Sequence, residues 1–149
     1  MYNKTTIWIM EEKTITLVQD SFEKVKPIAP EAAEIFYSKL FELDPALQSL
    51  FPNSDEDMKI QGNKLMSMLG SAVAGLNNLD ALIPILQDLG KRHLDYKVEE
   101  FHYQTVGEAL LKTLKTGLGD AFTPEVEEAW ATVYNTMADV MIRASYVKL

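Results

Sequence analysis

The two histidines, His93 and His102, are the side chains of this 149-residue chain that are best suited to bind a metal. The chain contains no cysteine, which excludes disulfides, iron–sulfur clusters, thiolate zinc sites and a cysteine nucleophile. One isolated histidine cannot form a zinc or non-haem iron site, because such a site needs three or four protein ligands. It can hold a haem, because the porphyrin already supplies four nitrogens.

His93 ends an apolar line along its predicted helix. The line consists of Leu82, Leu86, Leu89 and His93, and its spacings of four, three and four residues place all of them on one helical face. An imidazole there either is hydrogen-bonded in the core or binds something, and the spacing alone favours the core. His102 follows the charged pair Glu99-Glu100, which predicts a position near the surface.

Helical segments are expected to position these residues, and prolines or capping residues mark most of their ends. Ser54 is expected to cap one helix, with three acidic residues after it at the favourable end of the helix dipole. Thr123 is expected to cap another, with Pro124 at its first position. The predicted helices cover residues 14–25, 31–43, 55–76, 79–96, 99–118 and 124–141. They define a single all-α domain of about six to eight helices.

Composition and charge limit the partners of the chain. With 47% apolar and 24% charged residues, its length supports one domain with one core. The net charge of −8 opposes binding to phosphate backbones or anionic lipid, so no nucleic acid and no membrane is expected as a partner. The apolar stretches are far shorter than the roughly 20 residues that span a bilayer.

The first residues do not read as a secretion signal, because their apolar patch is brief and no cleavage-like end follows it. A cytoplasmic location is therefore expected. Met10 is followed at once by the acidic pair Glu11-Glu12 and is interpreted as an alternative start. Residues 1–13 are accordingly expected to form a loose N-terminal extension, and residues 14–149 the folded domain.

Three features agree in order and spacing with a known family. The segment DPALQSLF at residues 44–51 is followed ten residues later by Gln61, and His93 comes 32 residues after Gln61. In these features the chain resembles the globins, and more narrowly the bacterial single-domain haemoglobins and the haem domain of flavohaemoglobins. The likeness runs from about Thr14 to Met141 and includes the segment 101–111 and the helix around Trp130. It implies a globin fold around a pocket for haem b.

The resemblance implies roles for individual residues. His93 matches the proximal ligand, which binds the haem iron through one nitrogen. Phe51 matches the aromatic residue that packs on the porphyrin, and Pro45 matches the proline that turns the chain toward it. Lys64 and Arg92 are expected to reach the haem propionates through charge-assisted contacts. The implied haem contacts are His93, Phe51, Lys64, Leu65, Leu89, Arg92, Tyr103 and Val106.

Three residues match the distal side, where gases bind. Tyr37 matches the tyrosine that many bacterial globins point at the ligand, Gln61 stands where other globins carry a histidine, and Leu65 matches an apolar wall. The Tyr37 hydroxyl and the Gln61 amide can both donate hydrogen bonds to bound O2, which carries more charge than CO. Such a bond contributes roughly 1.5 to 3 kcal/mol, or about ten- to a hundredfold in dissociation. Gly62, opposite Ala33, would let the two helices cross closely.

Each assignment has an alternative that needs no haem. Phe51 and Leu65 are ordinary core residues in any helical protein. Tyr37 can direct its hydroxyl to solvent or to a backbone carbonyl, and Gln61 can be an exposed polar residue. The two cations at the implied pocket rim can be solvated surface charges.

The proximal side departs from the flavohaemoglobin pattern at one position. In that group a tyrosine and a glutamate hold the proximal imidazole and make it more anionic. Tyr103 matches the tyrosine, but a gapless alignment from Trp130 puts Ser145 where the glutamate would be. The departure weakens the case for peroxidase-like activation. The globin itself uses up the 149 residues, so flavin and nicotinamide domains are not expected and turnover would need an external reductase.

The resemblance implies a haem protein that reversibly binds O2, and also CO and NO, at a five-coordinate ferrous iron. A monomer or weak homodimer is expected. The alternative is an enzyme, a nitric oxide dioxygenase, in which O2 attacks NO to give nitrate and a separate reductase recycles the iron. A third possibility is a sensing or interaction module with a globin fold, with or without haem.

Overall fold

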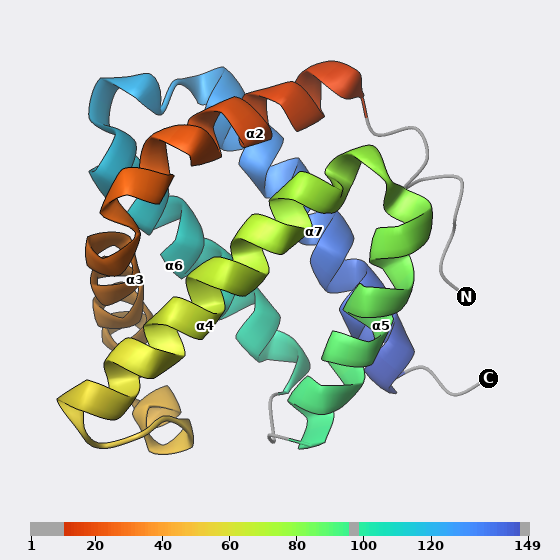
Figure 1. Cartoon of the computed structure of the whole chain (residues 1–149). Coiled ribbons are helices and arrows are strands. Elements are labelled where there is room, and N and C mark those ends of the chain that lie inside the picture. The colour runs from red at the N-terminus through yellow and green to blue at the C-terminus, as the bar shows by residue number, and fades with distance from the viewer. Residues whose placement is uncertain (1–10, 96–98, 147–149) are drawn as a thin grey trace.

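The computed structural model describes residues 11–95 and 99–146 and arranges their helices around one core (Figure 1). These residues form six α-helices and no β-strand. The helices are α2 (Glu12–Val25), α3 (Ala29–Leu43), α4 (Asp55–Ala74), α5 (Leu79–Asp95), α6 (Glu100–Leu118) and α7 (Pro124–Tyr146). The short 3-10 helices are η1 (Lys26–Ile28), η2 (Pro45–Leu50), η3 (Gly75–Asn77) and η4 (Gly119–Ala121). The all-α prediction is confirmed.

Capping side chains start two helices where the sequence predicts them. The Ser54 Oγ accepts a hydrogen bond from the Asp57 N–H at 3.1 Å and caps α4. The Thr123 Oγ1 accepts one from the Val126 N–H at 3.2 Å, and Pro124 is the first residue of α7. Each cap satisfies a backbone donor that has no acceptor within the first helical turn.

Other helix ends differ by a few residues from the prediction. The helix α2 begins at Glu12, two residues earlier than expected, and residues 1–10 of the expected extension lie outside the described residues. The helix α3 begins at Ala29 rather than at residue 31. Pro30 is compatible with this start, because a residue in the first turn of a helix does not need its N–H.

The helix α7 is central to the packing, with α2 and α5 against it, while α3 packs against α6 (Figure 1). Trp130 of α7 is completely buried, and its ring centroid lies 6.2 Å from that of Phe22 on α2. The Trp130 indole N–H donates to the Ser21 Oγ at 2.8 Å, and this hydroxyl donates to the Leu17 carbonyl at 2.7 Å. Both polar groups are therefore satisfied inside the core.

Two close helix crossings depend on glycine. A Cβ on Gly62 would lie 3.0 Å from the Ala33 Cβ, which confirms the predicted close approach of α4 to α3. A Cβ on Gly90 would lie only 2.8 Å from the Met141 Cα, so α5 approaches α7 this closely because Gly90 has no side chain. The first crossing positions α4, which carries Gln61, and the second positions α5, which carries His93.

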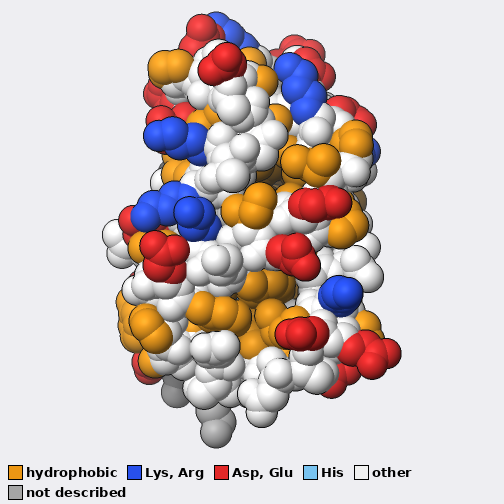
Figure 2. All heavy atoms as spheres, turned by 90° about the vertical axis from the view of Figure 1, so that its left-hand side faces the viewer, with side chains coloured by type: hydrophobic (Ala, Val, Ile, Leu, Met, Phe, Trp, Pro, Cys, Tyr) orange, Lys and Arg blue, Asp and Glu red, His pale blue; other side chains and the backbone are white. Residues whose placement is uncertain are grey.

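Most large apolar side chains of the described residues are at least partly covered. The exposed ones are Leu50, Ile60, Met68, Ile85 and Phe101. Figure 2 shows the side of the molecule on which α3 lies, where hydrophobic atoms gather in a hollow that acidic and basic groups border. Within the described part of the chain, no helix combines the length and the apolar character needed to cross a membrane.

Candidate haem site

His93 lies near the C-terminal end of α5 and is half-buried. Its Nδ1 lies 2.7 Å from the carbonyl oxygen of Leu89, one turn earlier in the same helix. A carbonyl can only accept a hydrogen bond, so Nδ1 carries the proton and the lone pair of the neutral ring is on Nε2. A hydrogen bond of this kind orients many metal-binding histidines. The arrangement suits coordination of an iron by Nε2.

Tyr103 of α6 lies beside His93, with 6.1 Å between the ring centroids. It is buried, and Val106, one turn later, is half-buried. The Tyr134 hydroxyl of α7 donates to the Tyr103 carbonyl oxygen at 2.6 Å, which ties this part of α6 to α7. Gly107 leaves room for the Tyr134 ring, because a Cβ there would lie 2.6 Å from it. Burial raises the pKa of the Tyr134 hydroxyl far above its ordinary value, so it stays a donor.

The Gln61 side chain of α4 lies close to the Tyr37 hydroxyl of α3 and acts on its pKa. Tyr37 is buried, and burial raises the pKa of its hydroxyl to about 12, while the nearby Gln61 side chain opposes part of the shift. The glycine crossing helps to bring them together, since a Cβ on Gly62 would lie 3.9 Å from the Tyr37 ring. The structure thus joins the two donors that the resemblance assigns to ligand binding.

Phe51 completes an aromatic cluster around Tyr37. Its ring packs edge-on against Tyr37 at 5.3 Å and against Phe41 at 5.4 Å, and Phe36 packs edge-on against Tyr37 at 5.2 Å. Aromatic pairs in such arrangements contribute about 0.5–1.5 kcal/mol each beyond their burial. The cluster fixes the ring of Tyr37, and with it the direction of the hydroxyl.

Two members of these clusters are not predicted from the sequence. Phe41 stands one turn after Tyr37, which is the signal that could have identified it. Tyr134 stands one turn after the buried Trp130, but its partner carbonyl is 31 residues away in the sequence. A contact of that kind leaves no trace in helical periodicity.

Lys64 and Arg92, the predicted partners of the haem propionates, are exposed on α4 and α5. Arg92 donates to the Asp88 Oδ2 from Nε at 3.0 Å and from Nη2 at 2.6 Å. An exposed pair one helical turn apart contributes only about 0.3–0.5 kcal/mol. Arg92 can therefore exchange this carboxylate for another at small cost.

Four apolar side chains that the resemblance assigns to haem contact are only partly covered by the protein. They are Phe51, Leu65, Leu89 and Val106. The core leucines Leu40 and Leu76, in contrast, are almost completely buried. Partial cover is expected of residues that face a bound apolar group.

The donor set of the site fits a haem. Among residues 11–95 and 99–146, no group of three or more His, Cys, Asp or Glu side chains could hold a metal ion. His93, with its Nδ1 oriented by a carbonyl, supplies one ligand, and a porphyrin supplies four more. The apolar, partly covered side chains suit the flat apolar surface of a porphyrin.

His102 is buried, with 9% of its surface exposed, so the prediction of a position near the surface is wrong. Its Nδ1 accepts a hydrogen bond from the Glu99 N–H at 2.9 Å, and the Glu99 carboxylate accepts one from the His102 N–H. This reciprocal capping box starts α6. The pair Glu99-Glu100 therefore marks a helix start and does not indicate that His102, two residues after the pair, is solvated.

Ser145 is half-buried on α7, and its hydroxyl donates to the Met141 carbonyl at 2.8 Å. Asp139, an acid on the same helix, is exposed and pairs with Arg143 at 3.0 Å. Neither residue supplies a buried carboxylate. In the described residues, the hydrogen-bond acceptor at the Nδ1 of His93 is the neutral Leu89 carbonyl.

The family model for globins matches residues 34–141, a range that includes Tyr37, Gln61 and His93. The chain belongs to the globin family. Its all-α architecture is accordingly the globin fold.

The chain is similar to both short and long proteins. Neuroglobin from Danio rerio is 31% identical over 145 residues, which cover 90% of this chain and 91% of the relative. Anaerobic nitrite reductase AHB2 from Arabidopsis thaliana is 33% identical over 139 residues, which cover 85% and 88%. The flavohemoprotein of Bacillus subtilis strain 168 is 28% identical over 134 residues, which cover 90% of this chain and 34% of the relative. The chain thus spans about a third of the flavohemoproteins that it matches.

Proposed function

We propose that this globin holds a haem b through His93 and binds O2 reversibly, with Tyr37 and Gln61 as hydrogen-bond donors to the ligand. The observation that carries the proposal is the close approach of the Gln61 side chain on α4 to the buried Tyr37 on α3. Two donors from different helices meet there, beside the ring of Phe51. We expect CO and NO to bind as well, and we place the protein in the cytoplasm as a monomer or weak homodimer.

Haem supplies an iron that binds diatomic gases, and the chain supplies the iron ligand and the walls of the pocket. His93 would hold the iron through Nε2, with Nδ1 oriented by the Leu89 carbonyl. The chain has no cysteine to form a thioether link, which favours haem b. The residues that would contact the porphyrin are Phe51, Leu65, Leu89, Tyr103 and Val106, and those for the propionates are Lys64 and Arg92.

The protonation of Tyr37 decides whether its hydroxyl can donate. Burial raises the pKa of this hydroxyl to about 12, so it carries its proton at neutral pH. Hydrogen bonds from two donors to a partly charged ligand slow its release, by about ten- to a hundredfold for a contribution of roughly 1.5 to 3 kcal/mol. Tight binding, sensing or oxidative chemistry fits this pocket better than delivery at high oxygen pressure.

A second function, nitric oxide dioxygenase, is favoured by the position of Tyr103 beside His93 and by the similarity to flavohemoproteins. In that reaction O2, NO and one electron give nitrate, and an external reductase would supply the electron. Ser145 argues against it, because its hydroxyl donates to its own helix and adds no negative charge. The imidazole of His93, bonded to a neutral carbonyl, is also less anionic than one bonded to a carboxylate.

Absorption spectra of the purified protein in the ferric, ferrous and CO-bound forms test the proposal. We expect one haem per chain and a ferrous spectrum that changes reversibly when O2 is added and removed. Sustained consumption of NO with an added reductase would favour the dioxygenase instead. A purified protein that takes up no haem would contradict both functions. A sensing or interaction module with a globin fold would then be the remaining possibility.

His93→Ala tests the iron ligand. This variant should retain little haem or hold it weakly, because the substitution removes the proposed iron ligand. The exposed neighbour Lys91 provides a control, and Lys91→Ala should keep one haem per chain. The haem-to-protein ratio after gel filtration measures both. An unchanged ratio and an unchanged ferrous spectrum in His93→Ala would refute the assignment.

A further inference from the structure

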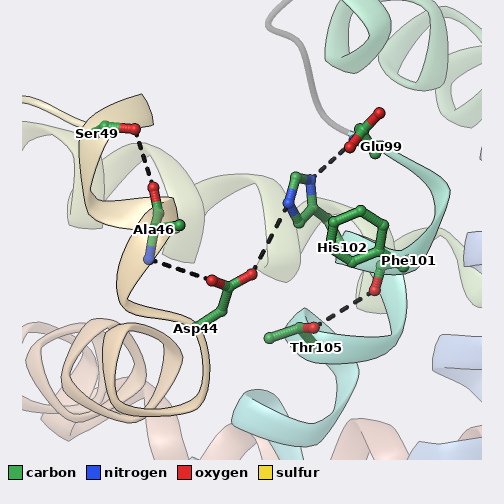
Figure 3. Close-up of polar contacts among 7 residues, drawn as sticks. All are labelled: Asp44, Ala46, Ser49, Glu99, Phe101, His102 and Thr105. Carbon is green, nitrogen blue, oxygen red and sulfur yellow. Dashed lines mark hydrogen bonds and ion pairs between the residues drawn. The ribbon is translucent and has the colours of Figure 1, made fainter.

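The His102 side chain lies between the start of α6 and the junction of α3 with η2, two segments far apart in the sequence (Figure 3). Its Nδ1 accepts a hydrogen bond from the Glu99 N–H at 2.9 Å. Its Nε2 lies 4.0 Å from the Asp44 Oδ2, and both side chains are largely covered. A single imidazole thus faces a partner on each of its two nitrogens.

The partners determine where the proton of the ring is. Because Nδ1 accepts a hydrogen bond, it carries a lone pair, so the neutral ring has its proton on Nε2. That proton is on the nitrogen that faces the Asp44 carboxylate. His102 therefore accepts a hydrogen bond from α6 and turns its N–H toward the Asp44 carboxylate, at a distance longer than a hydrogen bond.

Asp44 connects this contact to the Tyr37 side of the candidate site. Its Oδ1 accepts a hydrogen bond from the Ala46 N–H at 3.2 Å and caps η2. The short helix η2 buries Leu47 and leads directly to Phe51, whose ring lies 5.3 Å from that of Tyr37. The position of Asp44 thus determines where Phe51 begins to pack.

The other end of the contact leads to the His93 side of the site. His102 closes the capping box at the start of α6, and the next residue, Tyr103, lies 6.1 Å from the His93 ring. The start of α6 therefore determines where Tyr103 stands relative to His93.

We propose that His102 is a positioning residue, which sets the position of η2 relative to the start of α6. It thereby fixes where Phe51 and Tyr103 lie on the two sides of the haem pocket. This role rests on the proposed function. In this proposal His102 contacts neither the bound gas nor the iron. It acts through Asp44 on one side and through the capping box on the other.

Three variants separate the two contacts. His102→Gln keeps an acceptor for the Glu99 N–H and an N–H donor for Asp44, because glutamine is also a good residue at this capping position. His102→Leu removes both contacts. Asp44→Asn keeps the acceptor for the Ala46 N–H but turns an amide donor toward His102. Glu108→Gln, which loses only an exposed pair with Lys112 on α6, is the control.

Amide and imidazole nitrogen resonances of the haem-free and haem-loaded proteins test the contact without any use of gas binding. We expect an unprotonated Nδ1 and a protonated Nε2 at His102, and a shift of the Nε2 resonance in Asp44→Asn. In His102→Leu the amides of both Phe51 and Tyr103 should shift, and His102→Gln should return them toward the parent values. Shifts no larger than in Glu108→Gln, or a protonated Nδ1, would overturn the proposal.

O2 dissociation rates provide the second measurement. His102→Leu should change the rate by about threefold or more, which corresponds to the coupling found between contacting residues, and His102→Gln should restore it. The double variant Asp44→Asn/His102→Leu should have the same O2 dissociation rate as His102→Leu alone. A parent protein without O2 binding would refute the proposed function, and the resonances would then decide the positioning role alone. If His102→Leu does not fold, the resonances and O2 dissociation rates of His102→Gln and Asp44→Asn test the positioning role instead.

Discussion

Tyr37 and Gln61 are expected to act together on the distal side, because the Gln61 side chain lies close enough to the Tyr37 hydroxyl to act on its pKa. A buried hydroxyl is costly without a partner, so we expect Gln61 to support Tyr37 when no ligand is bound. The phenol has the stronger donor proton of the two. Tyr37 is therefore expected to donate directly to O2, with Gln61 supporting the phenol or the ligand from the side.

Tyr37→Phe should speed O2 dissociation by about ten- to a hundredfold, because it removes the direct donor and leaves the ring in place. CO dissociation should change much less, since bound CO carries little charge. Stopped-flow and flash-photolysis rates measure both. An unchanged O2 rate would remove Tyr37 from the site and leave Gln61 as the donor.

Gln61→Leu should have a smaller effect on O2 dissociation than Tyr37→Phe. The double variant should fall short of the product of the two single effects, because residues in one hydrogen-bonded network are not additive. The same rate measurements give the coupling. Fully multiplicative effects would show that the two residues act on the ligand independently.

The raised pKa of Tyr37 predicts a pocket that tolerates alkaline pH. Burial raises this pKa from 10.0 to about 12, so the stability that it contributes is complete below pH 10 and is lost as the pH rises through about 12. The O2 dissociation rate should stay constant between about pH 7 and about pH 10 and rise above that. Rates of the Tyr37→Phe variant over the same range are the control. A rise near pH 8 that this variant lacks would contradict the shift.

His93 and Gln61 could be identified from the sequence, because their spacing from the segment 44–51 agrees with that of the globins. Contacts between residues far apart in the sequence could not be identified. The hydrogen bond from Tyr134 to the Tyr103 carbonyl joins helices whose separate patterns do not reveal their mutual orientation. The burial of His102 does not follow from the nearby pair Glu99-Glu100, because acidic residues predict solvation while here Glu99 is a helix cap. The capping box of Glu99 and His102 does not have the usual sequence pattern of serine or threonine followed three residues later by glutamate or glutamine, and the cover of His102 by Asp44 comes from another element.

At the scale of elements, the position of His93 depends on how closely α5 can approach α7. Gly90 permits this approach, because a Cβ there would lie 2.8 Å from the Met141 Cα. Backbone atoms cannot rotate away as a side chain can, so the helices would have to separate. His93 is one turn of the same helix further on and would move with it.

Gly90→Ala should destabilise the protein by about 1–3 kcal/mol through this overpacking and should weaken haem retention. Gly117→Ala is the matched control on α6, because its Cβ would meet only the Ile28 Cδ1 at an ordinary 3.4 Å. The control should be neutral or stabilising by up to about 1 kcal/mol, as alanine favours helices over glycine. Urea unfolding of both variants measures the difference, and equal stability would refute the crossing argument.

The elements themselves were largely predictable, since caps and apolar spacing act within a few residues. Ser54 and Thr123 start their helices as predicted because the side chain bonds a backbone N–H three residues away. The sequence predicts the start of α3 two residues too late, because Pro30 is typical of a helix end, although a proline also fits a first turn. Which helices pack together was not predictable from periodicity, because a helical stripe shows that a face is buried and not what covers it.

At the scale of the whole molecule, haem would cover side chains that the protein alone leaves half-exposed, among them Leu65 and Val106. The holoprotein should therefore be more stable than the apoprotein, by about 2.7 kcal/mol when free haem is at one hundred times its dissociation constant. Thermal melting at several haem concentrations measures this increment. Identical melting with and without haem would favour a haem-free module.

The buried indole of Trp130 provides a fluorescence signal from inside the core. Its ring is fully shielded from water and its N–H is held by Ser21, so its fluorescence should be blue-shifted. The other tryptophan, Trp8, lies outside the described residues and can be replaced by phenylalanine, which leaves a single emitter at the junction of α2 and α7. Haem absorbs where indole emits, so energy transfer would quench this emission on uptake and restore it on loss. The chain thereby carries its own reporter of cofactor exchange, with no added dye.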